Sequence, residues 1–321
     1  ATIMTELQHV HSSEQFSLAD LDLLFARAAE IKAQILRDPD DDDGILGTRL
    51  FRRRMVTLFE EPSSRTVLSF SSAMVLLGGS VISLHNTSRE KGESWEDTAM
   101  TISMNHPHVL VVRLSKEKAL KKMLKVSTVP IIGGGQGTGQ HVTQGMLDVF
   151  TLLERMGSLD GKHIALCGDL KNGRTVHSLS ILLGLYPGIK LTLVSHKALQ
   201  MPEWVMQELS RQKVSVVVTD NFQEVARDSS VDVLYLTRDQ DERKSGNDSD
   251  GFGSCRLTDE LIATLGEHTL VAHPLPRVEG AEEMPPTFDG DGRALYWNQV
   301  ENGVFVRGAL LEKVLGVLKA A

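Results

Sequence analysis

The sequence is poor in cysteine, with only Cys167 and Cys255 among its 321 residues. Two thiols cannot form a disulfide framework, so this usage predicts a reducing compartment, the cytoplasm. Cys167 ends the apolar run that begins at Ile164. A free cysteine in such a run is typical of a protein interior, and we expect an inert core thiol there.

Long apolar runs and an excess of positive charge are also missing. No stretch approaches the ~18 consecutive apolar residues that a membrane helix needs. The 34 lysines and arginines are outnumbered by 42 acidic residues, which gives a net charge of −8. A nucleic-acid partner requires a basic face, so we expect neither a nucleic-acid nor a membrane partner. Small anions are not excluded, because a few arginines in a cleft can act against the net sign.

The first residues, 1–6, carry no basic flank and no apolar core, so they do not read as a secretory signal. The sequence also begins without Met. We expect a processed form or a piece of a longer chain.

The remaining composition, 41% apolar and 24% charged, is that of a globular protein with room for two domains. Continuous apolar strands alternate with helical stretches throughout, and this predicts an α/β fold of two lobes. Each lobe is expected to be a mainly parallel sheet covered by helices on both faces. The predicted domains are 1–145 together with a C-terminal helix, 300–321, that packs back on the first lobe, and 146–299. The predicted strands are 55–59, 80–84, 108–112, 129–132, 163–167, 190–194, 214–218, 232–236 and 269–272.

Polar segments follow six of these strands directly. Ligands of open α/β sheets bind outside the carboxyl ends of the strands, so the six segments predict one functional edge. They are 62–66, Arg113, 133–141, 168–175, 237–240 and 273–277.

The segment 62–66 is expected to open a helix. Ser63, Ser64, Arg65 and Thr66 combine hydroxyls and a guanidinium with the unpaired amides of a helix start, which suits phosphate. A simple capping box would need only one hydroxyl.

The other segments carry weaker signals. Residues 168–175 imitate a phosphate-binding P-loop, but Arg174 stands where such a loop needs lysine. A nucleotide-dependent kinase is therefore a poor alternative. Arg174, Arg238 and Gln240 are candidates for clamping a dicarboxylate, against the plain alternative of surface salt bridges.

Residues 133–139 contain five glycines but fail the G-x-G-x-x-G spacing, so they favour no dinucleotide. His141 after them is either a structural residue or a group that polarises a carbonyl. Lys91, taken alone, reads as a solvated lysine.

Taken together, these motifs resemble the aspartate/ornithine carbamoyltransferase family over nearly the whole chain. His273-Pro-Leu-Pro276 resembles the aspartate branch, because the ornithine branch usually reads His-Cys-Leu-Pro. The chain is also similar to the corresponding domain of eukaryotic multifunctional pyrimidine-synthesis proteins. The motifs that carry the resemblance are residues 59–66, 77–80, 91–94, 143–148, 168–179, 237–243, 273–278 and 302–311.

The resemblance implies transfer of the carbamoyl group of carbamoyl phosphate to L-aspartate, with no metal and no organic cofactor. Residues 63–66 would hold the phosphate, and Arg113 and His141 would join Thr66 at the carbamoyl oxygen. Gln144 and the carbonyls of Pro274 and Leu275 would hold the carbamoyl amide, with a cis bond before Pro276. Arg174 would bind the α-carboxylate of aspartate, and Arg238 with Gln240 its side-chain carboxylate. Lys91, with Thr87 or Ser88, would reach a neighbouring subunit's site in a homotrimer.

The chain departs from the family pattern beside these residues, at Leu114, Val142, Gly280 and Gly308. The assigned side chains themselves are present, which favours an active enzyme over a degenerate domain kept for trimer assembly. Transfer to another amino acid, such as ornithine, remains an alternative.

Overall fold

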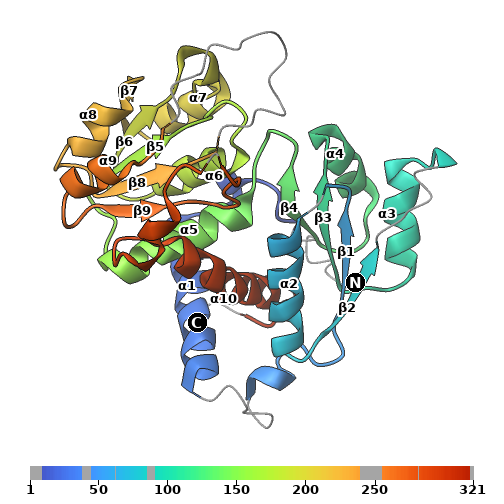
Figure 1. The fold of residues 1–321 in the computed structure, drawn as a ribbon. Helices are drawn as coiled ribbons and strands as arrows, with labels where there is room; N and C mark the ends of the chain where they lie inside the picture. The colour runs from blue at the N-terminus through green and yellow to red at the C-terminus, as the bar shows by residue number, and fades with distance from the viewer. Residues whose placement is uncertain are drawn as a thin grey trace. The chain divides into compact units, whose positions relative to one another are not determined.

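The computed structural model describes residues 9–37, 45–61, 63–84, 91–238, 255–280 and 282–318. It divides into two compact units (Figure 1): unit 1 comprises Ala1–Leu147 and Val300–Ala321, and unit 2 comprises Asp148–Gln299. Two helices, α5 (Val142–Met156) and α10 (Tyr296–Val314), each contain a unit boundary.

The sheet of unit 1 is parallel and has the strand order β2-β1-β3-β4. The path from β1 to β2 runs one way along the sheet, and the paths onward to β3 and β4 run the other way. Right-handed crossovers therefore place α2 on one face and α3 and α4 on the other. The elements are β1 (Arg54–Phe59), α2 (Ser64–Leu76), β2 (Ser80–Leu84), α3 (Trp95–Met104), β3 (Val109–Leu114), α4 (Glu117–Val126) and β4 (Ile131–Gln136).

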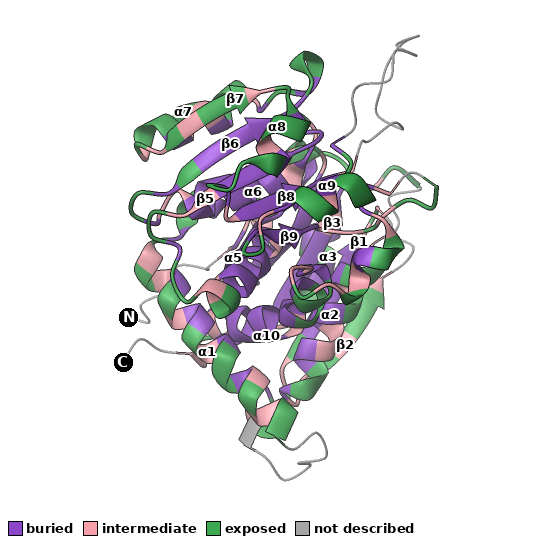
Figure 2. Cartoon of the chain, turned by 60° about the vertical axis from the view of Figure 1, so that its left-hand side comes forward, coloured by how far each residue is buried: buried purple, intermediate pink, exposed green. Residues whose placement is uncertain are grey.

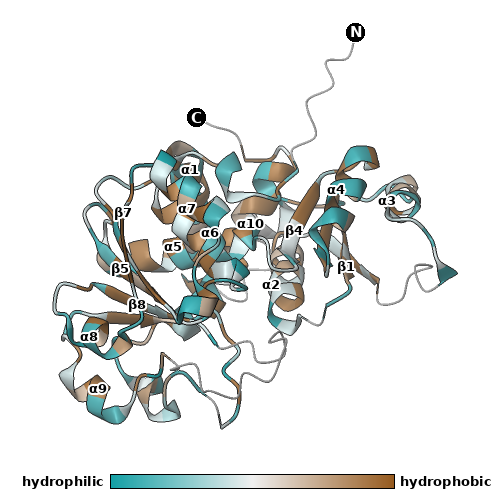
Figure 3. Cartoon of the chain, turned by 90° about the horizontal axis from the view of Figure 1, so that it is seen from above, coloured by the Kyte–Doolittle hydropathy of each residue, from teal (hydrophilic) through white to brown (hydrophobic). Residues whose placement is uncertain are grey.

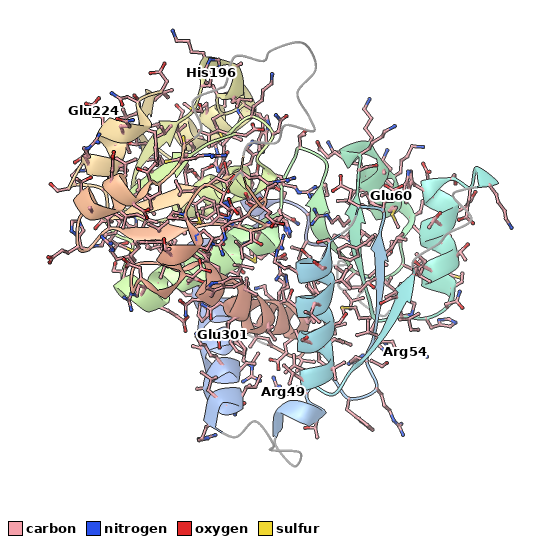
Figure 4. All side chains as sticks on the ribbon, in the orientation of Figure 1. Arg49, Arg54, Glu60, His196, Glu224 and Glu301 are labelled. Carbon is pink, nitrogen blue, oxygen red and sulfur yellow. The ribbon has the colours of Figure 1, made fainter. Side chains whose placement is uncertain are left out.

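Two helices distant in sequence complete unit 1. Glu312 of α10 is fully buried and accepts hydrogen bonds from Arg27 of α1 (Leu18–Arg37) and from Arg49, which is labelled in Figure 4. Arg307 of α10 donates to Ser69 of α2. The prediction that the terminal helix packs on the first lobe is confirmed.

Unit 2 repeats the same design with the strand order β7-β6-β5-β8-β9, all parallel. By the same crossover rule α6 and α7 cover one face, and α8 and α9 the other. The elements are β5 (His163–Cys167), α6 (Arg174–Leu183), β6 (Lys190–Val194), α7 (Glu203–Arg211), β7 (Ser215–Thr219), α8 (Phe222–Arg227), β8 (Val233–Leu236), α9 (Asp259–Thr264) and β9 (Leu270–Ala272). Short 3-10 turns lie at Ser13–Gln15, Ile45–Thr48, Lys197–Leu199 and Pro286–Gly290.

Central strands are buried on both faces, as parallel sheets covered by helices require. Figure 2 shows β5 and β8 buried while the edge strand β7 is largely exposed, and Figure 3 shows the apolar character of β5 and β8. β2, the edge of the other sheet, is also largely exposed. Cys167 and Cys255 are both buried, and burial raises the pKa of the Cys167 thiol well above its ordinary value. The prediction of a core thiol at Cys167 is confirmed.

The structure differs from expectation at the bounds of β4 and of the last helix and in two helices that were not predicted. The glycine-rich segment is not a loop from 133 onward, because β4 runs on to Gln136 with every residue buried. Its glycines permit this: a Cβ on Gly134 would lie 3.2 Å from Phe59 and 3.4 Å from Thr66. The last helix starts at Tyr296, and the short helices α4 and α8 were not predicted.

Among the residues that the structure describes, no helix combines the length and the apolar character needed to span a bilayer.

Candidate active site

The predicted site arginines Arg65, Arg113, Arg174 and Arg238 lie where the strand order of each sheet reverses, while His141 and Gln144 follow β4 and Pro274 and Leu275 follow β9. In unit 1 the chain runs outward from β1 in one direction and to β3 in the other, and in unit 2 the same holds for β5 and β8. Neighbouring connections diverge at such points and leave room for a ligand. The unit 1 cluster is defined as Ser63, Ser64, Arg65, Thr66, Arg113, His141 and Gln144. The unit 2 cluster is defined as Arg174, Arg238, Pro274 and Leu275.

The start of α2 is arranged as an anion site. Ser63 precedes the helix but makes no side-chain cap hydrogen bond to it. Its Oγ instead accepts from Arg113 Nη1 at 2.8 Å, while Arg113 Nε donates to Glu61 Oε2 at 3.3 Å. The first-turn amides of a helix have no intrahelical partner, so the start of α2 is electropositive. The guanidinium of Arg113 adds a positive charge at the same turn. Arg113 reaches it because it pairs in register with Phe59, the last residue of β1.

Thr66 and His141 meet in the interior of unit 1. Thr66 Oγ1 lies 3.5 Å from His141 Nε2, and both residues are buried. Gln144 follows in the first turn of α5, where its backbone N–H donates to the His141 carbonyl at 3.0 Å. The hydroxyl of Thr66 in α2 and the imidazole of His141, directly before α5, therefore lie next to each other.

The buried guanidinium of Arg307 holds the two segments that carry this cluster. Arg307 Nη1 donates to Ser69 Oγ at 2.7 Å, and Ser69 Oγ donates to the carbonyl of Arg65 at 2.8 Å. Arg307 Nη2 lies 3.4 Å from Thr143 Oγ1, between His141 and Gln144 in sequence. One guanidinium therefore connects α2 with the start of α5.

In the unit 2 cluster, the backbone that leaves β5 packs closely against the backbone that leaves β8. Gly168, at φ +118°, passes so close to Thr237 that a Cβ would lie 2.5 Å from the Thr237 carbonyl oxygen. Thr237 N and Oγ1 donate to the Cys167 carbonyl at 2.8 and 3.0 Å. These contacts fix Arg238, the next residue, beside the turn that leads to Arg174 at the start of α6.

The segment after β9 has a constrained backbone. His273 N donates to Gln299 Oε1 at 2.9 Å, and Leu275 N donates to His273 Nδ1 at 2.9 Å. Nδ1 therefore carries no proton, and the ring proton sits on Nε2, 3.2 Å from buried Glu283 Oε2. The bond between Leu275 and Pro276 is cis, as predicted.

Lys91 is exposed and lies shortly before α3. Thr87, Ser88 and Gln240 lie outside the described residues. Sequence reasoning assigned no role to Arg307, Asp148, Tyr235 or Gln299, although all four are buried and polar. Asp148 and Arg307 stand in two of the motifs that carry the resemblance, and with Tyr235 they interrupt apolar runs; Gln299 gave no signal.

Both clusters combine cationic side chains with a helix start at a strand end, which suits two anionic ligands rather than a metal or a nucleic acid. Within the described ranges, no group of three or more His, Cys, Asp or Glu residues could hold a metal ion.

Comparison with known proteins agrees with this chemistry. Residues 8–154 match the model of the aspartate/ornithine carbamoyltransferase carbamoyl-P binding domain, and residues 160–314 match that of the Asp/Orn binding domain. The chain is 40% identical over 315 residues to the aspartate carbamoyltransferase catalytic subunit of Methanopyrus kandleri, covering 96% of this chain and 97% of that protein. It is 39% identical to the multifunctional protein CAD of Squalus acanthias, of whose length it spans 13%.

Solved structures give the same result. The aspartate transcarbamoylase of Trypanosoma cruzi in complex with carbamoyl phosphate and aspartate superposes with a TM-score of 0.86 at 38% identity, over 95% of this chain and 96% of that chain. The fold and these matches define a carbamoyltransferase built from two α/β units. The chain belongs to the aspartate/ornithine carbamoyltransferase family.

Proposed function

We propose that this protein is an aspartate carbamoyltransferase, in which the unit 1 cluster binds carbamoyl phosphate and the unit 2 cluster binds L-aspartate. It transfers the carbamoyl group to the aspartate amine and forms N-carbamoyl-L-aspartate and phosphate, a step of pyrimidine synthesis. The observation that carries the proposal is the presence of cationic side chains and a helix start at the reversal point of each sheet. One such site suits a phosphate, and the other a carboxylate.

In unit 1, residues 63–66 bind the phosphate through hydroxyls, backbone amides and the Arg65 guanidinium. Thr66, Arg113 and His141 surround the carbamoyl oxygen, supported by the 3.5 Å contact between Thr66 and His141. Gln144 contacts the carbamoyl amide. Lys91, with Thr87 or Ser88, acts on the site of a neighbouring subunit.

In unit 2, Arg174 binds the α-carboxylate of aspartate, and Arg238 with Gln240 binds the side-chain carboxylate. The carbonyls of Pro274 and Leu275 accept from the carbamoyl amide. The hydrogen bond from Leu275 N to His273 supports this role, because it fixes the orientation of the adjoining peptide groups.

The reaction needs no protein nucleophile. The neutral aspartate amine attacks the carbamoyl carbon, a C–N bond forms, and the bond from that carbon to the phosphate oxygen breaks. Phosphate leaves with the bonding electron pair and takes up the proton that the amine loses. Negative charge develops on the carbonyl oxygen, and each donor aimed at it contributes roughly 3–4 kcal/mol to transition-state stabilisation.

Titration with a bisubstrate analogue that carries a phosphonate and a dicarboxylate tests this assignment. We expect tight binding to the wild type and a large loss of affinity in Arg174→Ala, with the exposed Arg211→Ala as the control. Product assays with aspartate and ornithine in competition test the substrate. Turnover of ornithine in place of aspartate would overturn the assignment of the acceptor, and absence of turnover in a folded protein would favour a degenerate assembly domain.

We further propose a homotrimer with shared active sites. Several large apolar side chains of unit 1 are exposed, which supports an oligomer interface on this unit. They are Leu68, Val75 and Leu76 of α2, Ile82 of β2, and Met100 and Met104 of α3. Mixing inactive Lys91→Ala and Arg65→Ala subunits should restore partial activity, because some sites then contain both native residues.

Two broader proposals concern the larger assembly and the compartment of the protein. The similarity to CAD supports a place within a larger multifunctional chain or complex. The two buried thiols support a reducing compartment, the cytoplasm.

A further inference from the structure

A continuous chain of buried hydrogen bonds runs through unit 2 and contains Asp148, which the reaction does not use directly. Tyr235 Oη donates to Asp148 Oδ2 at 2.7 Å. Gln299 Nε2 donates to Asp148 Oδ1 at 2.6 Å, and Gln299 Oε1 accepts from His273 N at 2.9 Å. All four residues are at most 2% exposed. This chain is called the Asp148 network below.

The direction of every hydrogen bond in the Asp148 network is fixed by chemistry. An ionised carboxylate only accepts, and a backbone N–H only donates. The Gln299 amide therefore has one orientation, with its NH₂ toward Asp148 and its oxygen toward His273. Tyr235 must donate to Asp148, and burial followed by the Asp148 charge raises the pKa of Tyr235 well above its ordinary value. The hydroxyl thus stays protonated.

The network reaches all three segments of the unit 2 cluster. Tyr235 lies in β8, three residues before Arg238. Its side chain also has a hydrogen bond with Thr175, the residue after Arg174. At the other end His273 N belongs to the backbone that leads to Pro274 and Leu275. A single carboxylate on α5 therefore connects the segments proposed to bind aspartate and the carbamoyl amide.

We propose that Asp148 is a positioning residue that sets the relative placement of Arg174, Arg238 and the Pro274–Leu275 carbonyls. This inference rests on the proposed function and adds to it. Asp148 does not touch the substrate. It acts through Tyr235 and Gln299, because moving either partner moves a segment that carries substrate-binding groups.

The first test is Asp148→Asn, which keeps the shape and removes the charge. The asparagine oxygen can still accept from Tyr235, but its NH₂ then faces the NH₂ of Gln299. Turning the Gln299 amide would break its bond to His273. A hydrogen bond to a charged group of this kind corresponds to roughly 10- to 100-fold in affinity, so we expect the KM for aspartate to rise by about that factor.

A second substitution provides the rescue. In Asp148→Asn with Gln299→Glu, the asparagine NH₂ donates to the new carboxylate, whose other oxygen accepts from His273 N. We expect the double variant to recover most of the aspartate affinity that the single variant loses. Asp160→Asn, an exposed aspartate of the same unit, is the matched control.

The measurements separate positioning from mere stability. Steady-state kinetics give KM and kcat for both substrates, and hydrogen exchange at the His273 amide reports the network without any substrate. Rapid exchange at His273 together with a raised KM, both reversed in the double variant, is the expected result. A lowered melting temperature with KM and kcat within twofold of the wild type would overturn the inference.

If Asp148→Asn does not fold, Tyr235→Phe applies the same test, because it deletes one donor and keeps the ring. An unchanged KM in a folded Tyr235→Phe protein would then count against the proposal. Failure of the proposed function is distinguishable, because it would appear as absence of turnover in the wild type itself.

Discussion

The two units place the same kind of helix start on supports of opposite charge. In unit 1, α2 is anchored through Ser69 to the buried guanidinium of Arg307. In unit 2, β8 is anchored through Tyr235, and the segment after β9 through Gln299, to the buried carboxylate of Asp148. In both cases a neutral polar group stands between the buried charge and the binding segment.

This difference shows that the sign of a supporting charge need not match the ligand. A hydroxyl donates on one side and accepts on the other, so it can connect a cation or an anion to the same kind of backbone. What the buried ion contributes is a fixed direction for each hydrogen bond. A guanidinium only donates and a carboxylate only accepts, so the neutral group bonded to either ion has one orientation.

The largest effect should separate the two clusters by substrate. Arg65→Ala and Arg113→Ala remove donors from unit 1, and we expect kcat to fall by about 10²- to 10³-fold. Arg174→Ala should chiefly raise the KM for aspartate. Steady-state kinetics with each substrate varied in turn measure both. Equal effects of all three variants on both substrates would contradict the division of labour.

The next effect concerns a buried charge of unit 1, Glu312. Burial raises the pKa of this carboxyl, but hydrogen bonds from Arg27 and Arg49 outweigh it, so the net pKa is lowered from its ordinary value of 4.5. A lowered folded-state pKa stabilises the protein above the unfolded pKa, and this contribution is lost as the pH falls through the folded pKa. Glu312→Gln should therefore cost about 3 kcal/mol at neutral pH, because two partly buried arginines lose the charged acceptor of their hydrogen bonds.

Denaturant unfolding at several pH values checks this. The gap between the wild type and Glu312→Gln should shrink as the pH falls below about 4.5. The matched control is Glu208→Gln in unit 2, whose partner Arg211 is 70% exposed. An exposed pair of this kind contributes less than about 1 kcal/mol. A pH-independent gap for Glu312 would be inconsistent with an ionised partner.

A smaller effect is expected from Arg307→Met, which preserves length and removes the supporting cation. Ser69 and Thr143 lose a charged donor that typically contributes about 1.5–3 kcal/mol. We expect roughly tenfold weaker binding of carbamoyl phosphate, measured by calorimetry, with aspartate affinity in unit 2 less affected. An equal loss for both ligands would mean that the supports are not local to each unit.

The smallest effect is stabilising and concerns Gly308 in α10. A Cβ there would make ordinary contacts, at 3.4 Å from Ile31 and 3.5 Å from Leu77. Gly308→Ala should therefore raise the free energy of unfolding by up to about 1 kcal/mol through helix propensity. Gly303→Ala in the same helix is the contrast, because its Cβ would lie 2.6 Å from Arg307 Nη1. Thermal melts of the two variants should move in opposite directions.

Much of the fold was predictable because apolar runs in strands and apolar faces of helices indicate which residues are buried. The site turns were predictable because they follow strand ends. β4 was predicted too short, since glycine reads as a loop signal and its tolerance for close packing against Phe59 becomes visible only in three dimensions. Asp148 and Arg307 were missed for a related reason. A buried charge is recognised by its partners, and Tyr235 or Ser69 lies far away in sequence.

Unit 1 is built from two segments that are far apart in the chain, and this has a consequence for folding during synthesis. Glu312 satisfies Arg27 and Arg49, although more than 260 residues separate it from either. The ribosome must therefore translate the whole of unit 2 before the first unit can complete its interior. Unit 2 is contiguous in sequence and can fold first. The amino-terminal half must then wait, with α1 and α2 lacking the helix that packs against them, until α10 itself has been translated.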